Sequence, residues 1–389
     1  MTPHAVYLHI PFCTTKCTYC AFNTYVQLEF LIEPFVDALI KEIRLVGQNK
    51  PGLDVHTIFF GGGTPSLLLP EQFARIFTAL RESYNVFPDA EISLEANPND
   101  LNREYMIALR RVGFNRLSIG MQSANENELQ LFRRRHDSDA VVRAVSAARS
   151  GGFDNLNLDL IYGIPHQTLD GWRNTLTQTL VLKPEHISLY ALGLEEGTPM
   201  ERWVETGRLP APDDDLAADM YNLATELLGA AGYEQYEISN WARPGLACKH
   251  NLQYWRNLPY LAFGPGAHGW AAGVRYSVLL SPQRYIKVMN TMNEAAGAYD
   301  FPRTPATDMF DVIEREGEIA ETLIMGLRLT REGIDREIFR QRFGADLLDV
   351  HRQEIDKFVG RGLLTVDDTR VKLTDDGRLL SNIVFRELV

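Results

Sequence analysis

Six short apolar runs alternate with helical patterns in the first 190 residues, and this alternation limits the fold more than any other feature of the chain. Segments between the runs, such as 33–46 and 70–83, carry apolar residues at helical spacing. Such alternation predicts βα units around a parallel sheet. Six units are too few for a closed eight-stranded barrel, so the sequence predicts an α/β fold with an open, partial (β/α)6 barrel. The runs cover residues 5–8, 57–60, 91–94, 116–119, 157–161 and 186–190.

The pattern changes twice after the sixth run. Glycine, proline and three consecutive aspartates interrupt it over 195–215, and an aromatic-rich region follows. The tail from residue 308 shows helical patterns, the last over 347–359, then a predicted hairpin over 363–374 and a final helix. Helices followed by a hairpin are typical of a winged-helix-like module. We therefore expect a barrel core over 1–195, a middle region over 196–305 and a C-terminal winged-helix-like α+β module over 306–389.

Composition and charge exclude several classes of protein. The chain is 45% hydrophobic and 23% charged, which is typical of a protein with a sizeable core. Its formal net charge is −12, and residues 308–389 hold 13 basic against 18 acidic side chains, so we expect no nucleic-acid partner. The sequence shows no signal peptide and no apolar run of membrane-spanning length. With four cysteines and no disulfide pattern, a cytoplasmic protein that does not span a membrane is expected.

Three of the four cysteines lie close together, directly after the first predicted strand. They are Cys13, Cys17 and Cys20, and the fourth is the distant Cys248. A structural zinc site needs four protein ligands, which three clustered thiols cannot supply. Three thiolates can hold three irons of a [4Fe-4S] cluster and leave the fourth iron open. The spacing therefore predicts Cys13, Cys17 and Cys20 as cluster ligands.

Polar and glycine residues follow most of the other predicted strands. In parallel α/β folds, ligands bind at the carboxyl ends of the strands. We therefore expect these residues and the three cysteines to converge on one face of the barrel. The segments concerned are 61–65, 95–98, 120–123 and 162–165.

The C-x3-C-x2-C run over 13–20, with Tyr7 ahead of it and the Gly-Gly-Gly-Thr-Pro segment 61–65 downstream, resembles the radical S-adenosylmethionine superfamily. That resemblance implies that S-adenosylmethionine chelates the open iron and is cleaved to a 5′-deoxyadenosyl radical. Nearly all of the chain resembles one branch, the oxygen-independent coproporphyrinogen oxidases and their relatives. This resemblance places around the adenosylmethionine the residues Tyr7, Gly63, Thr64, Glu95, Gln122, Arg134 and Asp159.

One position departs from the oxidases of this branch. They resemble the chain but carry a fourth cysteine two residues after the third, where this sequence has Phe22. Segments 236–241 and 250–255 instead resemble the haem-chaperone members of the branch. That resemblance implies a protein that binds haem and passes it to a haem-accepting protein, such as a respiratory, membrane-associated one. A monomer and a homodimer are both compatible with the sequence.

His250 is the first residue that we expect as a haem contact, because a neutral imidazole is a good axial ligand. A His-Asn pair beside aromatic residues could equally be a packing feature. Cys248 is a rival thiolate ligand, and His268 within a glycine-rich segment is a third candidate.

Three functions remain in competition. The first is a haem chaperone that carries a [4Fe-4S] cluster and exchangeable S-adenosylmethionine. The second is an oxygen-independent coproporphyrinogen III oxidase, which the missing fourth cysteine disfavours. The third is a radical enzyme that acts on RNA or another macromolecule, which the acidic net charge disfavours.

Overall fold

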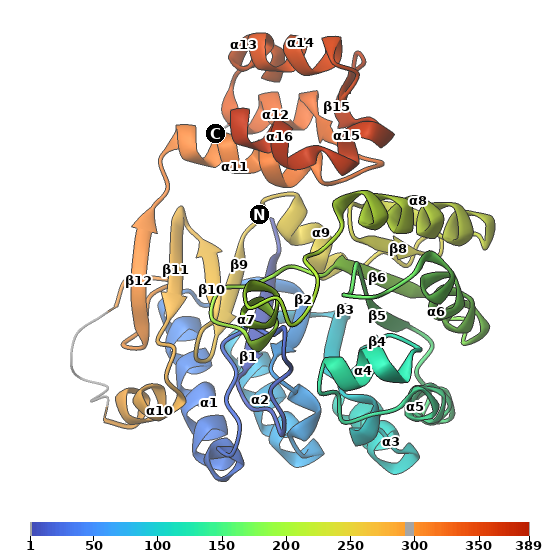
Figure 1. Ribbon diagram of the computed structural model, residues 1–389. Helices are drawn as coiled ribbons and strands as arrows, with labels where there is room; N and C mark the ends of the chain where they lie inside the picture. The colour runs from blue at the N-terminus through green and yellow to red at the C-terminus, as the bar shows by residue number, and fades with distance from the viewer. Residues whose placement is uncertain (1, 292–298, 389) are drawn as a thin grey trace.

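A curved sheet of parallel strands, backed by helices, forms the centre of the computed structural model, which describes residues 2–291 and 299–388 (Figure 1). The first six strands are parallel and lie side by side in chain order, as the alternation of apolar runs predicts. The α/β partial (β/α)6 barrel is thereby confirmed. The six strands are β1 (His4–Ile10), β2 (Asp54–Gly62), β3 (Asn85–Ala96), β4 (Arg116–Gln122), β5 (Leu156–Tyr162) and β6 (His186–Ala191).

Helices between these strands cover the outer face of the sheet. In the first helix, Phe35, Leu39 and Ile43 recur at helical spacing and are fully buried against it. Proline at the first helical position begins the second helix at Pro70, where its missing N–H costs nothing. The helices are α1 (Ile32–Asn49), α2 (Pro70–Ser83), α3 (Arg103–Val112), α4 (Glu126–Leu131), α5 (Ser138–Ser150) and α6 (Leu169–Val181), with 3-10 turns at Glu29–Leu31, Pro65–Leu67 and Pro98–Asp100.

The sheet continues on both sides of the barrel strands to a total of twelve strands. On the β1 side it adds β9 (Tyr260–Phe263), which is parallel to β1, then the antiparallel strands β10 (His268–Ala271), β11 (Val274–Val278) and β12 (Thr307–Val312). On the β6 side it adds β8 (Asn240–Ala242) and β7 (Glu234–Glu237). The helices of this region are α7 (Pro199–Glu205), α8 (Asp214–Ala230), α9 (Lys249–Trp255) and α10 (Pro282–Thr291).

The C-terminal module has its own hydrophobic core and lies above the sheet in Figure 1. A three-stranded sheet and several helices form it, which matches the predicted α+β module. The predicted helix over 347–359 is two helices, because the backbone at His351 leaves the helical conformation (φ −129°, ψ 34°). Its elements are α11 (Arg315–Leu327), β13 (Ile334–Asp335), α12 (Arg336–Phe343), α13 (Leu347–Val350), α14 (Arg352–Gly360), β14 (Leu364–Val366), β15 (Arg370–Leu373), α15 (Asp375–Leu379) and α16 (Ser381–Glu387).

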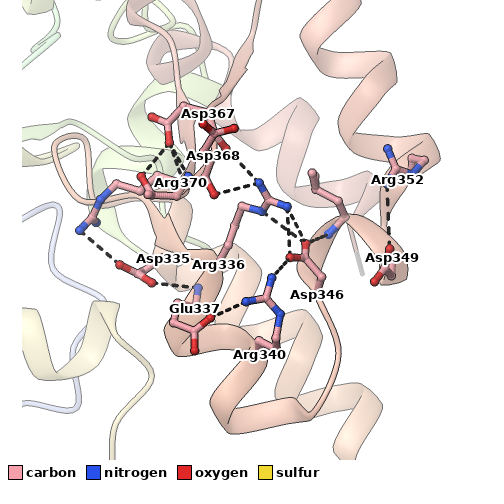
Figure 2. Close-up of polar contacts among 12 residues, drawn as sticks. Asp335, Arg336, Glu337, Arg340, Asp346, Asp349, Arg352, Asp367, Asp368 and Arg370 are labelled. Carbon is pink, nitrogen blue, oxygen red and sulfur yellow. Dashed lines mark hydrogen bonds and ion pairs between the residues drawn. The ribbon is translucent and has the colours of Figure 1, made fainter.

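Asp346 holds one corner of this module together (Figure 2). Its carboxylate accepts hydrogen bonds from the guanidinium groups of Arg336, at 3.1 Å, and of Arg340, and it caps α13 through the N–H of Leu348. Partial burial raises the pKa of Asp346, but these donors outweigh it and hold the pKa below its usual value.

Two large hydrophobic cores and two small clusters lie within the described residues. The larger of the two large cores joins the barrel strands to residues of the middle region, and the other lies within 319–388. The boundaries at 195/196 and 305/306 stay a prediction. Of the helices in 2–291 and 299–388, none combines the length and the apolar character needed to cross a membrane.

Candidate functional site

A cavity of about 600 Å³ opens at the carboxyl ends of the barrel strands. We call it the cluster cavity. It brings together most of the residues predicted from the sequence, although they come from six separate segments. Those on its wall are Cys13, Cys17, Cys20, Gly63, Thr64, Glu95, Gln122, Arg134 and Asp159.

The loop that carries the cysteines is fixed at several points. The backbone N–H of Cys13 donates to the carbonyl of Tyr25 at 2.9 Å, and the hydroxyl of Thr18 donates to the carbonyl of Leu131 at 2.8 Å. These bonds tie the loop to its own end and to α4. The three sulfurs are consequently presented to the cavity from one ordered segment.

Two of the thiols receive hydrogen bonds from neighbouring side chains. Thr64 donates to Sγ of Cys13, and Arg134 donates to Sγ of Cys17, each over 3.4 Å. Burial raises the pKa of the Cys13 thiol, while the Thr64 hydroxyl lowers it. Donors and a positive charge beside the sulfurs stabilise thiolates, which is the form that binds iron.

Gly63 is placed where the residue next to the cysteine loop must be small. A Cβ atom at this position would lie 2.6 Å from the carbonyl oxygen of Phe12 and 3.1 Å from Sγ of Cys13. Glycine therefore allows β2 to end directly against the first cysteine.

The arrangement of donors fits an iron–sulfur cluster. Within the described ranges, no three His, Cys, Asp or Glu side chains converge as a site for one metal ion requires. A [4Fe-4S] cluster needs no such convergence, since each thiolate binds a different iron. In addition, Nε of Arg134 is buried without a hydrogen-bond partner among the described residues, on the wall where a ligand of the cluster would lie.

Two half-buried carboxyl groups line the cluster cavity. Glu95 accepts a hydrogen bond from the N–H of Gly62 at 3.1 Å, and burial together with the charge of Asp159 raises its pKa to about 7. Asp159 accepts hydrogen bonds from Ser118 at 2.7 Å and Asn157 at 2.8 Å. Burial raises the pKa of Asp159 as well, against the opposing effect of those donors.

Gln122 ends β4 in the left-handed backbone region, with φ at +66°. A Cβ atom on the neighbouring Gly120 would lie 2.9 Å from the side-chain nitrogen of Gln122 and 3.0 Å from Nη2 of Arg134. The end of β4 thus brings the side chains of Gln122 and Arg134, both predicted from the sequence, close to Gly120. Arg134 is also held by donating to the carbonyl of Gly120 at 2.9 Å.

Tyr7 and His250 line a second, smaller cavity of about 190 Å³ instead. We call it the inner cavity; it shares Glu95, Ser118, Asp159 and Tyr190 with the cluster cavity. The hydroxyl of Tyr7 is 3.1 Å from Nδ1 of His9.

His250 is buried with both ring nitrogens engaged. Nδ1 is 2.9 Å from the hydroxyl of Thr57, and Nε2 is 2.8 Å from the hydroxyl of Tyr254. Burial lowers the pKa of His250 to about 3, and the ring stacks on Phe59 with 5.0 Å between centroids. Burial therefore favours the neutral form of this imidazole, and its contacts fix the ring in a packed environment.

The two rival haem ligands lie in different surroundings. Cys248 is buried and donates to the carboxylate of Glu91 over 3.4 Å, and burial raises its pKa to about 12. His268 is exposed at the start of β10.

Sequence reasoning missed two residues of this region. Arg116 is 2% exposed and lines the inner cavity, and its Nε has no hydrogen-bond partner in the described part of the chain. A charged residue at the start of an apolar strand was the available signal. His9 links Tyr7 to the cysteine loop, because its Nε2 is 3.0 Å from the carbonyl of Asn23, and only the fold reveals that link.

The chain is similar in sequence and in fold to known proteins. The model of the radical SAM superfamily matches residues 7–178, and that of the HemN C-terminal domain matches 313–380. Heme chaperone HemW of Mycobacterium tuberculosis is 37% identical, over all of this chain and 95% of its own. Heme chaperone HemW of Bacillus subtilis is 34% identical, over 98% of each chain. The structure of coproporphyrinogen III oxidase (HemN) from Escherichia coli superposes with a TM-score of 0.83 at 25% identity, over 99% of this chain and 90% of its own.

Fold and site together define a protein of the radical SAM class with a HemN-type C-terminal domain. Membership of that class implies a [4Fe-4S] cluster and S-adenosylmethionine. The chain belongs to the HemW family.

Proposed function

We propose that this protein binds haem and transfers it to an acceptor protein, and that it carries a [4Fe-4S] cluster with exchangeable S-adenosylmethionine. The observation that carries the proposal is the full-length similarity, at 33–37% identity, to bacterial proteins named heme chaperone HemW. The acceptor is a haem protein, for which a respiratory, membrane-associated one is our first candidate. The net charge of −12 argues against a nucleic-acid partner, and a cytoplasmic location fits a chain with few cysteines.

The alternative, oxidation of coproporphyrinogen III, is less well supported. Identity to the solved oxidase is 25%, against 37% to a haem chaperone. At the position where the oxidases carry a fourth cysteine, this chain has Phe22, which is 68% exposed and lines the cluster cavity. A phenyl ring offers no ligand for iron at that position.

We assign the cluster to Cys13, Cys17 and Cys20. A bound cluster with S-adenosylmethionine supplies one-electron reducing chemistry. The chain's own contribution is electrostatic: the hydroxyl of Thr64 and the guanidinium of Arg134 hydrogen-bond two of the sulfurs and offset their negative charge.

We assign the adenosylmethionine to the adjoining wall of the cluster cavity. Gly63 leaves room beside the cysteines, and the carboxyl groups of Glu95 and Asp159 suit an ammonium group and ribose hydroxyls. Gln122 adds an amide on the same wall. Tyr7 would contribute from the inner cavity, which Glu95 also lines.

His250 stays in the proposal as a haem contact to be tested. Ligation of iron by His250 would require loss of its bond to Thr57 or to Tyr254. A packing role for His250, which holds the side chains of Thr57 and Tyr254, is compatible with the same contacts.

Anaerobic titration of the reconstituted protein with haem, with and without S-adenosylmethionine, tests the proposal. We expect saturable, stoichiometric uptake. Protein with an intact cluster that takes up no haem would contradict the proposed function.

A further inference from the structure

Arg116 is a buried cation that has no direct partner among the described side chains. It is 2% exposed, its Nε lacks a hydrogen-bond partner, and its guanidinium forms no ion pair within residues 2–291 and 299–388. A charge taken out of water is costly unless opposite charges or hydrogen bonds compensate for it. For Arg116, the fold offers opposite charges at longer range.

Strand β4 carries Arg116 to the inner cavity. Alternate residues of a strand project from the same face. On this strand Arg116 and Ser118 line the inner cavity, whereas Ser118, Gly120 and Gln122 line the cluster cavity. Arg116 therefore stands on the side of Ser118 that is remote from the cysteines, about 7 Å from it along the strand.

The carboxyl groups of Glu95 and Asp159 lie where the two cavities meet. Glu95 is directly opposite Ser118 on the neighbouring strand, and Asp159 accepts a hydrogen bond from Ser118 at 2.7 Å. Both acidic residues line both cavities, whereas Arg116 lines the inner cavity alone. Of the described residues on the wall of the inner cavity, Arg116 is the one arginine or lysine.

The charge of Arg116 favours the ionised form of both carboxyl groups. Burial raises the pKa of Glu95 and of Asp159, and the charge of Asp159 raises that of Glu95 further. Arg116 opposes this effect at both groups. S-adenosylmethionine carries a sulfonium and an ammonium group, so carboxylates bind it better than neutral carboxylic acids do.

We propose that Arg116 is a positioning residue that acts through Glu95 and Asp159: from the inner cavity it holds both carboxyl groups in the anionic form that receives S-adenosylmethionine. The guanidinium opposes the repulsion between the two acids from the side remote from the cluster cavity. This inference rests on the proposed function, because it takes Glu95 and Asp159 as part of the adenosylmethionine site.

Other titratable groups surround Arg116. The carboxylate of Glu91 accepts hydrogen bonds from the N–H groups of Lys249 at 3.1 Å and His250 at 3.0 Å. Burial and the charge of Arg116 lower the pKa of His186 and of His250, which keeps both rings neutral. Burial raises the pKa of the remaining groups, which are Tyr7, Tyr190, Tyr236, Cys248 and Tyr254.

The test is anaerobic calorimetric titration of the full-length, cluster-loaded protein with S-adenosylmethionine at about pH 6 and about pH 8.5. At the lower pH, Arg116→Gln should raise the Kd about tenfold over the wild-type value, because fewer carboxyl groups are ionised. At the higher pH the two Kd values should agree within about twofold, since both carboxyl groups ionise without help. Arg116→Lys, which keeps the charge, should restore the wild-type Kd at the lower pH.

A second arginine variant controls for the loss of a charge. Arg149 is partly buried, pairs with Glu185 at 2.9 Å and lines neither cavity. Arg149→Gln should therefore leave the Kd unchanged at both pH values. Cluster content and the unfolding temperature verify that each variant is folded, and Arg116→Met replaces Arg116→Gln in the comparison if the latter does not fold.

The outcomes separate this inference from the proposed function. Cluster-loaded wild-type protein that binds no S-adenosylmethionine overturns the cofactor assignment and this inference with it, while haem uptake is measured independently. Equal Kd values for wild type and Arg116→Gln at both pH values overturn the inference alone. Equal weakening at both pH values, or no recovery in Arg116→Lys, also overturns it, because either result marks a merely structural role.

Discussion

Arg134 donates one hydrogen bond to Sγ of Cys17 over 3.4 Å and a second to the carbonyl of Gly120 over 2.9 Å. The hydrogen bond to Gly120 fixes the guanidinium at the end of β4. The guanidinium therefore points toward Cys17, a proposed cluster ligand. A partly buried cation so close to a sulfur favours negative charge there. Arg134 therefore couples the barrel strand to the electrostatics of the cysteine loop.

Arg134→Gln should make the reduction potential of the cluster more negative. Reduction adds negative charge to the cluster, and the variant loses a positive charge and an N–H···S bond beside it. A redox titration followed by EPR measures the shift. Arg133→Gln removes the same charge from the cavity wall at a side chain that lies over the ring of Trp203, so it separates the loss of charge from the loss of the N–H···S bond. Equal potentials in wild type and Arg134→Gln would contradict this role.

Cys17→Ala should abolish the [4Fe-4S] signal of the reduced protein, because two thiolates cannot hold the cluster. Cys248→Ala should leave it intact, since that thiol is buried beside Glu91. EPR and iron analysis of both variants measure the effect. An unchanged signal in Cys17→Ala would refute the ligand assignment.

Glu42 should make stability depend on pH. It is 1% exposed, receives hydrogen bonds from Gly264, Tyr285 and Thr304, and burial raises its pKa from 4.5 to about 7. Between these values the folded state binds more protons than the unfolded state, so the free energy of unfolding falls as pH rises. The decrease from Glu42 alone is at most about 3 kcal/mol.

Denaturant unfolding of wild type and Glu42→Gln from pH 4.5 to pH 7 measures this effect. In the variant, the free energy of unfolding should no longer decrease with pH in this way, whatever its absolute value. Glu82→Gln, which removes an exposed carboxylate paired with Arg44, controls for the loss of one charge. Parallel pH profiles for wild type and Glu42→Gln would rule the effect out.

Asp346→Asn should destabilise the C-terminal module by about 1–3 kcal/mol, because it removes the charge shared by Arg336 and Arg340. Asp349→Asn is the matched control, since Asp349 makes an exposed ion pair with Arg352 at 4.0 Å (Figure 2). Limited proteolysis and thermal unfolding compare the two variants. Equal destabilisation by the two variants would show that the contact of Asp346 with Arg336 and Arg340 contributes nothing to stability.

Local patterns in the sequence predicted most of the barrel. The helix over 70–83 agrees with the structure at both ends, because Pro70 and the apolar spacing are local signals. The break at His351 was not predicted, since the apolar spacing continues through it. The twelve-stranded sheet was not predicted either, because strands such as β9 and β10 pair with partners far away in the chain.

The site residues that belong to a sequence motif could be predicted from the sequence. The three cysteines, Gly63 and Arg134 came from the C-x3-C-x2-C spacing and the family resemblance, and they reach one cavity in the structure. Residues whose role depends on tertiary contacts, such as Arg116, were not predicted from the sequence.

The most direct test of the account is to offer haem and coproporphyrinogen III to the same reconstituted protein, under anaerobic, reducing conditions with S-adenosylmethionine. The account predicts saturable haem uptake and no protoporphyrinogen product. Robust turnover of coproporphyrinogen without haem uptake would contradict it.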